Sequence, residues 1–275
     1  MTKLSGKVAL ITGAGRGIGQ AIAVKLASEG ASLILNDLDE GPANETVAAV
    51  EAVGGAAEVV LGDVTAEDFA ERFVATAVDK FGGIDIVVNN AGYTWDGVIQ
   101  KMGDPQWEAM LAVHLTGPFR ILRAASEFIR AAAKREAEAG EAVHRKVVNI
   151  SSISGVCGNA GQANYAAAKM GVVGLTKALA KEWGRYRVNV NCVAFGLIDT
   201  RLTQPRGAED ATLAMPEAEI RVGIPAEAHQ AIVAATPLGR AGTPEDAANA
   251  VYLLCTPESD FITGQLVMAT GGFMY

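Results

Sequence analysis

The chain has 275 residues, of which 50% are hydrophobic and 20% are charged, and its formal net charge is −8. This composition excludes a disordered chain, and the negative charge disfavours nucleic acid or an anionic membrane surface as the main partner. No apolar run approaches the roughly 18 residues of a membrane span. We therefore expect neither nucleic acid nor a membrane among its partners.

Three cysteines, Cys157, Cys192 and Cys255, are widely spaced and form no C-x-x-C pair. They fit free thiols in a reducing compartment better than a disulfide framework or a zinc site. The apolar run near the N-terminus is too short for a signal peptide. These features predict a cytoplasmic protein without a bound metal.

Apolar runs alternate with longer helical patterns along the chain. The predicted strands span residues 8–12, 32–36, 57–61, 84–89, 147–151, 188–193 and 266–269, and the predicted helices span 18–29, 44–53, 66–81, 105–139, 163–183 and 244–254. Most of the strands are near-continuously apolar, as strands buried on both faces should be, and the alternation implies right-handed crossovers. We predict an α/β fold with a single doubly wound domain over residues 1–275. It has a parallel sheet of about seven strands and helices on both faces.

Two segments stand apart from this pattern. Residues 131–146 are rich in alanine and charge, which is typical of a solvated helix extension and its exit loop. Residues 197–235 interrupt the alternation and hold three prolines, Pro205, Pro216 and Pro225. A long excursion before the last helix favours a substrate loop or lid over a linker.

The first strand runs into residues 12–19, TGAGRGIG, which open a helix. Gly13 permits the tight turn, Gly17 lets the backbone approach a pyrophosphate, and Gly19 lets the helix pack on the strand. The helix N-terminus offers free N–H groups and a positive dipole end to the phosphates. The spacing departs from the strict G-x-G-x-x-G, but its place between strand and helix favours a dinucleotide site over a plain turn. We therefore predict a Rossmann-type domain.

The nucleotide form depends on two opposing residues. Asp37 ends the second strand, about 20 residues after Gly17, where a carboxylate accepts hydrogen bonds from ribose hydroxyls and repels a 2′-phosphate. Arg16 would pair with such a phosphate. Each residue also has a structural alternative: Arg16 is then a solvated surface residue, and Asp37 only begins a turn. We expect NAD(H) to be preferred, with NADP(H) as the alternative cofactor. The contact between the Asp37 carboxylate and a 2′-phosphate would cost more free energy than an exposed pair between Arg16 and that phosphate would contribute.

A second group of residues suggests acid–base chemistry. Tyr165 and Lys169 are four residues apart in a helical run and share one face. An ammonium nearby favours the phenolate and lowers the tyrosine pKa, so that the hydroxyl can exchange a proton with a substrate. Ser152 follows a strand at the sheet edge where ligands bind, and its hydroxyl can hydrogen-bond a substrate oxygen.

With these residues the chain resembles the short-chain dehydrogenase/reductase family over essentially its whole length. The matching segments are TGAGRGIG at 12–19, GDV at 62–64, NNAG at 89–92, Ser152 and YAAAK at 165–169. The resemblance implies that Tyr165 is the acid/base, that Ser152 orients the substrate and that Lys169 binds the nicotinamide ribose. The implied cofactor site comprises Gly13, Arg16, Gly17, Ile18, Gly19, Asp37, Asp63, Val64, Asn90, Ala91, Gly92, Tyr165, Lys169, Gly196, Ile198 and Thr200. Asp63 and Val64 would contact adenine, and Thr200 would hold the carboxamide.

Two positions depart from the family pattern. His114 stands where the family usually has an asparagine that holds a water in a proton relay, so His114 is either a catalytic relay residue or a packed helix residue. Phe195-Gly196 replaces the usual Pro-Gly after the sixth strand, where Phe195 either narrows the nicotinamide pocket or fills space.

The segment GNAGQANYAAAK at 158–169 is similar to the bacterial 3-oxoacyl-[acyl-carrier-protein] reductase branch. We therefore expect an NAD(P)-dependent oxidoreductase that interconverts a ketone and a secondary alcohol by hydride transfer. Its small carbonyl or alcohol substrate would be an acyl thioester on coenzyme A or acyl carrier protein. An NAD-dependent 3-hydroxyacyl-CoA, hydroxysteroid or polyol dehydrogenase remains an alternative. A non-catalytic dinucleotide sensor is disfavoured because Ser152, Tyr165 and Lys169 are all present.

The C-terminal run 261–275 is apolar and glycine-rich. It is similar to the family segment that packs across a two-fold axis, and on a monomer it would expose a large apolar patch. We therefore expect a homotetramer.

Overall fold

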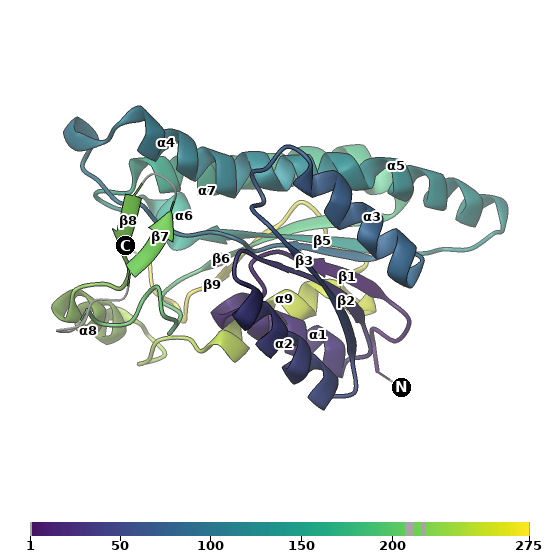
Figure 1. Ribbon diagram of the computed structural model, residues 1–275, viewed down its shortest axis with the longest axis horizontal. Helices are drawn as coiled ribbons and strands as arrows, with labels where there is room; N and C mark the ends of the chain where they lie inside the picture. The colour runs from purple at the N-terminus through teal and green to yellow at the C-terminus, as the bar shows by residue number, and fades with distance from the viewer. Residues whose placement is uncertain (1, 207–211, 216–217, 275) are drawn as a thin grey trace.

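A computed structural model describes residues 2–206, 212–215 and 218–274 (Figure 1). Seven strands form one parallel sheet in the order β3-β2-β1-β4-β5-β6-β9. The strands are β1 (Val8–Ile11), β2 (Ser32–Asp37), β3 (Ala56–Leu61), β4 (Ile86–Asn89), β5 (Arg145–Ser152), β6 (Val188–Phe195) and β9 (Leu266–Ala269). The order reverses between β1 and β4, which is the topological switch point of a doubly wound sheet. The predicted Rossmann-type α/β fold is confirmed.

Helices cover both faces of the sheet (Figure 1). One face carries α1 (Gly17–Ser28), α2 (Glu40–Ala52) and α9 (Pro244–Cys255), and the other carries α3 (Phe69–Phe81), α4 (Asp104–Leu111), α5 (Gly117–Glu138) and α7 (Ala163–Trp183). Each face has its own apolar core, because the near-continuously apolar strands contribute side chains to both. Every residue of β1 and β6 is buried, as expected for central parallel strands.

Several predicted elements coincide with the structure and others are corrected. Residues 163–183 and 266–269 match α7 and β9. The second helix begins at Glu40 rather than residue 44, because Pro42 is tolerated in a first turn that needs no N–H donors. The helix predicted over 105–139 is divided into α4 and α5 by η2 (Ala112–Thr116), a π-helical segment.

The segment predicted as a lid has structure of its own. The strands β7 (Thr212–Met215) and β8 (Ala218–Arg221) pair as an antiparallel hairpin, and α8 (Ala226–Ala235) follows. The sequence pattern did not predict these elements, and residues 207–211, 216 and 217 lie outside the described part of the chain. Among the described helices, none has the length and apolar character needed to cross a membrane.

Candidate active site

The carboxyl ends of the central strands open into a cleft of about 1040 Å³. All the site residues that the sequence predicts line this one cleft: Gly13, Arg16, Gly17, Ile18, Gly19, Asp37, Asp63, Val64, Asn90, Ala91, Gly92, His114, Ser152, Tyr165, Lys169, Gly196, Ile198 and Thr200. They come from segments up to 187 residues apart, from position 13 to position 200. The parallel sheet places them together because its strands end at one edge.

The glycine loop fits a cradle for a pyrophosphate. Gly13 and Gly17 have φ angles of 62° and 55°, in the left-handed region that favours glycine. A Cβ on Gly13 would lie 2.7 Å from the Cα of Ala91, and a Cβ on Gly19 would overlap the Gly13 carbonyl oxygen. The loop therefore leaves its backbone accessible at the N-terminus of α1, the arrangement that binds phosphates.

Two threonine hydroxyls hold the glycine loop in place. The Thr12 hydroxyl accepts N–H bonds from Asn90 and Ala91, each at 3.0 Å. The Thr46 hydroxyl, buried in α2, donates to the Ala14 carbonyl at 3.0 Å. Thr12 opens the glycine motif of residues 12–19, whereas no motif marks Thr46, because its partners are backbone groups that the fold brings near.

At the end of β2, the Asp37 carboxylate is fixed by backbone donors. Its Oδ2 accepts the Gly15 N–H at 2.8 Å and its Oδ1 accepts the Asp39 N–H at 3.1 Å. A Cβ on Gly15 would lie 2.7 Å from that same Oδ2, so only glycine lets the loop approach the carboxylate this closely. Asp37 thus presents a fixed acceptor in the part of the cleft that the glycine loop borders.

The acid–base candidates meet deeper in the cleft. The Lys169 ammonium donates to the Ile150 carbonyl at 2.7 Å and lies 5.6 Å from the centroid of the Tyr165 ring. Ser152 ends β5, and its hydroxyl accepts the Ser154 N–H at 3.2 Å as the N-cap of α6 (Ile153–Cys157). Burial lowers the pKa of Lys169 to about 8. The ammonium is the only buried charge shown beside Tyr165 within the described part of the cleft.

His114 lies in the π-helical segment and is 3% exposed. Its Nε2 is 2.7 Å from the Tyr93 carbonyl oxygen, and its ring contacts the Tyr165 ring edge-on with centroids 4.9 Å apart. Burial, with the Lys169 charge, lowers the His114 pKa well below 6.5, so the ring is neutral at pH 7. A carbonyl can only accept, so Nε2 carries the proton and Nδ1 is a bare acceptor, which is buried with no hydrogen-bond partner among the described residues.

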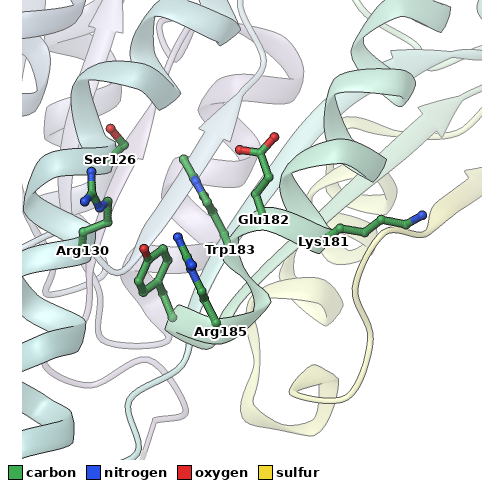
Figure 2. Close-up of a pocket in the computed structure, with 7 residues that line it drawn as sticks. Ser126, Arg130, Lys181, Glu182, Trp183 and Arg185 are labelled. Carbon is green, nitrogen blue, oxygen red and sulfur yellow. The ribbon is translucent and has the colours of Figure 1, made fainter.

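A second hollow of about 580 Å³ lies among α5, α7 and η3 (Gly184–Tyr186) (Figure 2). Its lining comprises Ser126, Arg130, Lys181, Glu182, Trp183, Arg185 and Tyr186, and Figure 2 shows Lys181 extending away from the others. It shares no residue with the first cleft, so it is not part of the candidate active site. Within the described residues, no cluster of His, Cys, Asp or Glu has the composition of a metal site.

Comparison with known proteins identifies the class. Residues 7–211 match the short chain dehydrogenase family, and residues 220–274 match the family described as enoyl-(acyl carrier protein) reductase. The chain therefore belongs to the short-chain dehydrogenase family. It is an oxidoreductase that depends on NAD(P)(H) and interconverts a ketone and a secondary alcohol.

Several relatives are similar over nearly the whole chain. It is 35% identical to a 3-oxoacyl-[acyl-carrier-protein] reductase of Thermotoga maritima, over 99% of both chains. It is 38% identical to a protein of the same name from Vibrio cholerae serotype O1, over 98% of both. It is 35% identical to a (3R)-3-hydroxyacyl-CoA dehydrogenase of Canis lupus familiaris, over 98% of this chain and 97% of that one.

A solved structure has the same fold. A crystal structure described as a short-chain alcohol dehydrogenase from Sinorhizobium meliloti 1021 superposes with a TM-score of 0.84 at 29% identity. The match covers 98% of this chain and 97% of that one, so it includes both the sheet and the C-terminal segment.

The burial of Lys169 predicts a gain in stability when its charge is removed. Its pKa is about 8 in the folded chain against an ordinary 10.5, so the folded state binds fewer protons between these values. The penalty is complete below about pH 8 and is relieved as the pH rises towards 10.5. After a loss of about 1 kcal/mol for the bond to Ile150, Lys169→Met should raise the unfolding free energy at pH 7 by about 2 kcal/mol.

Urea unfolding of both proteins at pH 7 and pH 10 measures this difference. The difference in unfolding free energy between Lys169→Met and the wild type should be smaller at pH 10. Lys177→Met, on the exposed side of α7, should show neither the gain in stability nor its dependence on pH. A Lys169→Met protein less stable than the wild type at pH 7, or a gap independent of pH, would contradict the burial penalty.

Proposed function

We propose that the protein acts on 3-oxoacyl and 3-hydroxyacyl thioesters, with Tyr165 as the acid/base. The observation that carries the proposal is the Tyr165–Lys169 pair beside Ser152 in a single cleft. Relatives named as a 3-oxoacyl-[acyl-carrier-protein] reductase and a 3-hydroxyacyl-CoA dehydrogenase support a thioester substrate, since both names share that chemistry. The two names give different carriers, acyl carrier protein and coenzyme A, so the proposal extends to the thioester and not to one carrier.

The cofactor would lie across the switch point of the sheet. The glycine loop and the N-terminus of α1 would hold the pyrophosphate, Asp63 and Val64 would contact adenine, and Asp37 would accept from the ribose hydroxyls. Gly92, Asn90 and Ala91 would flank the nicotinamide half, as would Gly196, Ile198 and Thr200. When bound, the cofactor supplies or accepts the hydride.

The protein's own residues would handle the proton. Ser152 would donate to the substrate oxygen and orient it towards Tyr165. In reduction the Tyr165 hydroxyl would give its proton to that oxygen, and the charge left on the phenolate would be stabilised by the Lys169 ammonium. Lys169 would also donate to the nicotinamide ribose hydroxyls, since the bond to Ile150 uses one of its N–H groups.

His114 would complete the proton path. Its buried Nδ1 acceptor fits a water that passes protons towards Lys169, whose charge is close enough to lower the His114 pKa. A side chain that only filled space would not need this acceptor. We therefore place His114 in the catalytic group rather than among the packed residues of the helix.

Segment 197–235 would act as the lid over the substrate, in one domain that spans residues 1–275. Arg201, Arg206, Ile220, Ile224 and Ile232 from this segment line the cleft, which supports that role. Phe195 is 5% exposed and belongs to the apolar core, which supports the space-filling alternative, and it also lines the cleft, which supports the narrowing alternative.

We also propose a cytoplasmic homotetramer. Within the run 261–275, Phe261, Ile262, Val267 and Met274 are exposed in or near the edge strand β9 in sequence, and a second copy would cover them. Tyr275 of the predicted contact run lies outside the described residues. The cytoplasmic location is supported by three free cysteines, which fit a reducing compartment.

Tyr165→Phe should abolish turnover of acetoacetyl-CoA and leave cofactor binding nearly unchanged. The hydroxyl is needed only to move a proton, so kcat should fall by about 10²–10⁴-fold. Steady-state kinetics and calorimetric titration of the cofactor measure the two effects. The matched control is Tyr186→Phe in the second hollow, which should keep wild-type kinetics.

The same assay tests the substrate class. Acetoacetyl-CoA and its acyl-carrier-protein counterpart should be turned over more efficiently than a 3-ketosteroid or a polyol. Activity within a few-fold of wild type in Tyr165→Phe would refute its role, and a preference for the steroid or polyol would refute the thioester proposal.

Replacement of His114 separates the proton path from packing. His114→Asn keeps a donor for the Tyr93 carbonyl and an acceptor, so it should keep most of the activity. His114→Leu, of similar size, should lower kcat on the order of tenfold or more with little change in KM. Equal activity in the asparagine and leucine variants would show that the ring only packs.

NADH should bind at least about tenfold more tightly than NADPH, which corresponds to a difference of about 1.4 kcal/mol or more in binding free energy. A 2′-phosphate would meet the fixed Asp37 carboxylate, and a like-charge contact at 4 Å costs roughly 4 kcal/mol before screening. Asp37→Ala should narrow the gap and Arg16→Ala should widen it. Calorimetric titration of both cofactors checks this, and tighter NADPH binding by the wild type would show that Arg16 outweighs Asp37.

A further inference from the structure

Arg16 is not free to meet a phosphate in this structure. Its Nη1 forms an ion pair with the Asp39 Oδ2 at 2.6 Å, and both side chains line the cleft. Arg16 is the N-cap residue of α1, and its guanidinium, which has only donors, makes no capping bond to the helix. Asp39 is the partner that the structure shows for this guanidinium among the described residues.

The geometry around Asp37 explains why Asp39 sits there. The Asp39 N–H donates to the Asp37 Oδ1, which turns the chain so that the second carboxylate follows the first towards the loop. The other Asp37 oxygen accepts the Gly15 N–H, directly before Arg16. Two carboxylates and one guanidinium therefore gather at the ribose end of the cleft, with a net charge of −1 from Arg16, Asp37 and Asp39.

We propose that Asp39 is a specificity-determining residue that acts through Arg16 to disfavour NADP(H). To pair with a 2′-phosphate, Arg16 must leave Asp39 or share itself between two anions. Asp39 also adds a negative charge near the phosphate. NAD(H) has a hydroxyl at that position, so its binding leaves the Arg16–Asp39 pair intact. This inference rests on the proposed placement of the cofactor, and it assigns to Asp39 a role that the sequence pattern gave to Arg16 and Asp37 alone.

The exposure of the pair sets the size of the effect. The side chains of Arg16 and Asp39 are 45% and 55% exposed, so water screens their attraction. Exposed ion pairs contribute up to about fivefold in an equilibrium constant, which is the gain expected when Arg16 no longer has to leave a partner. Direct repulsion between Asp39 and the phosphate adds less, because it acts over a longer distance through solvent.

A double-mutant cycle tests the proposal by cofactor binding rather than activity. Calorimetric titration at low, constant ionic strength gives the Kd of NADH and NADPH for the wild type, Asp39→Asn, Arg16→Ala and the double variant. Asp39→Asn should bind NADPH about fivefold more tightly than the wild type and should change the NADH Kd by less than about twofold. In the Arg16→Ala background, the same change should improve NADPH binding by less than about twofold.

The matched control is Glu45→Gln, which removes one exposed negative charge from α2, the helix that follows Asp39, without touching Arg16. It should leave both Kd values unchanged. No gain in Asp39→Asn would overturn the proposal, as would an equal gain with and without Arg16, since Asp39 would then act as a simple charge. The wild-type ratio of the two Kd values tests the proposed NAD(H) preference separately, so that proposal and this one can fail independently.

Discussion

The buried ammonium group of Lys169 is the interaction on which the rest of the site depends. It is held by the Ile150 carbonyl at 2.7 Å beneath the Tyr165 ring, and burial lowers its pKa only to about 8, so it stays mostly protonated at pH 7. A cation at this depth favours a phenolate at Tyr165 and a neutral ring at His114. The phenolate is the state that Tyr165 would reach after giving its proton in the proposed reduction, and the neutral ring keeps the His114 Nδ1 as an acceptor. A group that costs stability in the folded chain would therefore serve the chemistry.

The parallel sheet brings this cation and the glycine loop of residues 12–19 to the same edge. Thr12 links the loop after β1 to Asn90 after β4, and the Ser151 hydroxyl at the end of β5 donates to the Lys169 carbonyl at 2.7 Å. At two places, segments approach each other so closely that only glycine fits between them. A Cβ on Gly155 would lie 2.9 Å from the Lys169 Cβ, and one on Gly92 would overlap His114. These glycines thus let the segments that carry Lys169 and His114 pack closely against their neighbours.

The fold and most of the cleft could be predicted because their signals are local. Continuous apolar runs mark buried strands, and the glycine loop and the Tyr165–Lys169 spacing lie within single segments. The π-helical turn around His114 was not predicted, since no residue in the run 105–139 marks the place where a helical turn takes an extra residue. Asp39 was missed for a similar reason: it reads as a turn residue until the fold brings it to Arg16, 23 positions earlier in the chain.

The most direct measurement is the ionisation of Tyr165 itself, followed by ultraviolet absorbance of the phenolate as the pH rises. The chain has five tyrosines, so the difference between the wild type and Tyr165→Phe isolates the one of interest. At and below about pH 8, where Lys169 is still protonated, we expect a larger phenolate fraction at Tyr165 in the wild type than in Lys169→Met, because only the wild type then holds a cation 5.6 Å from the centroid of the ring. Ionisation at the same pH in both proteins would contradict the central role of the buried ammonium.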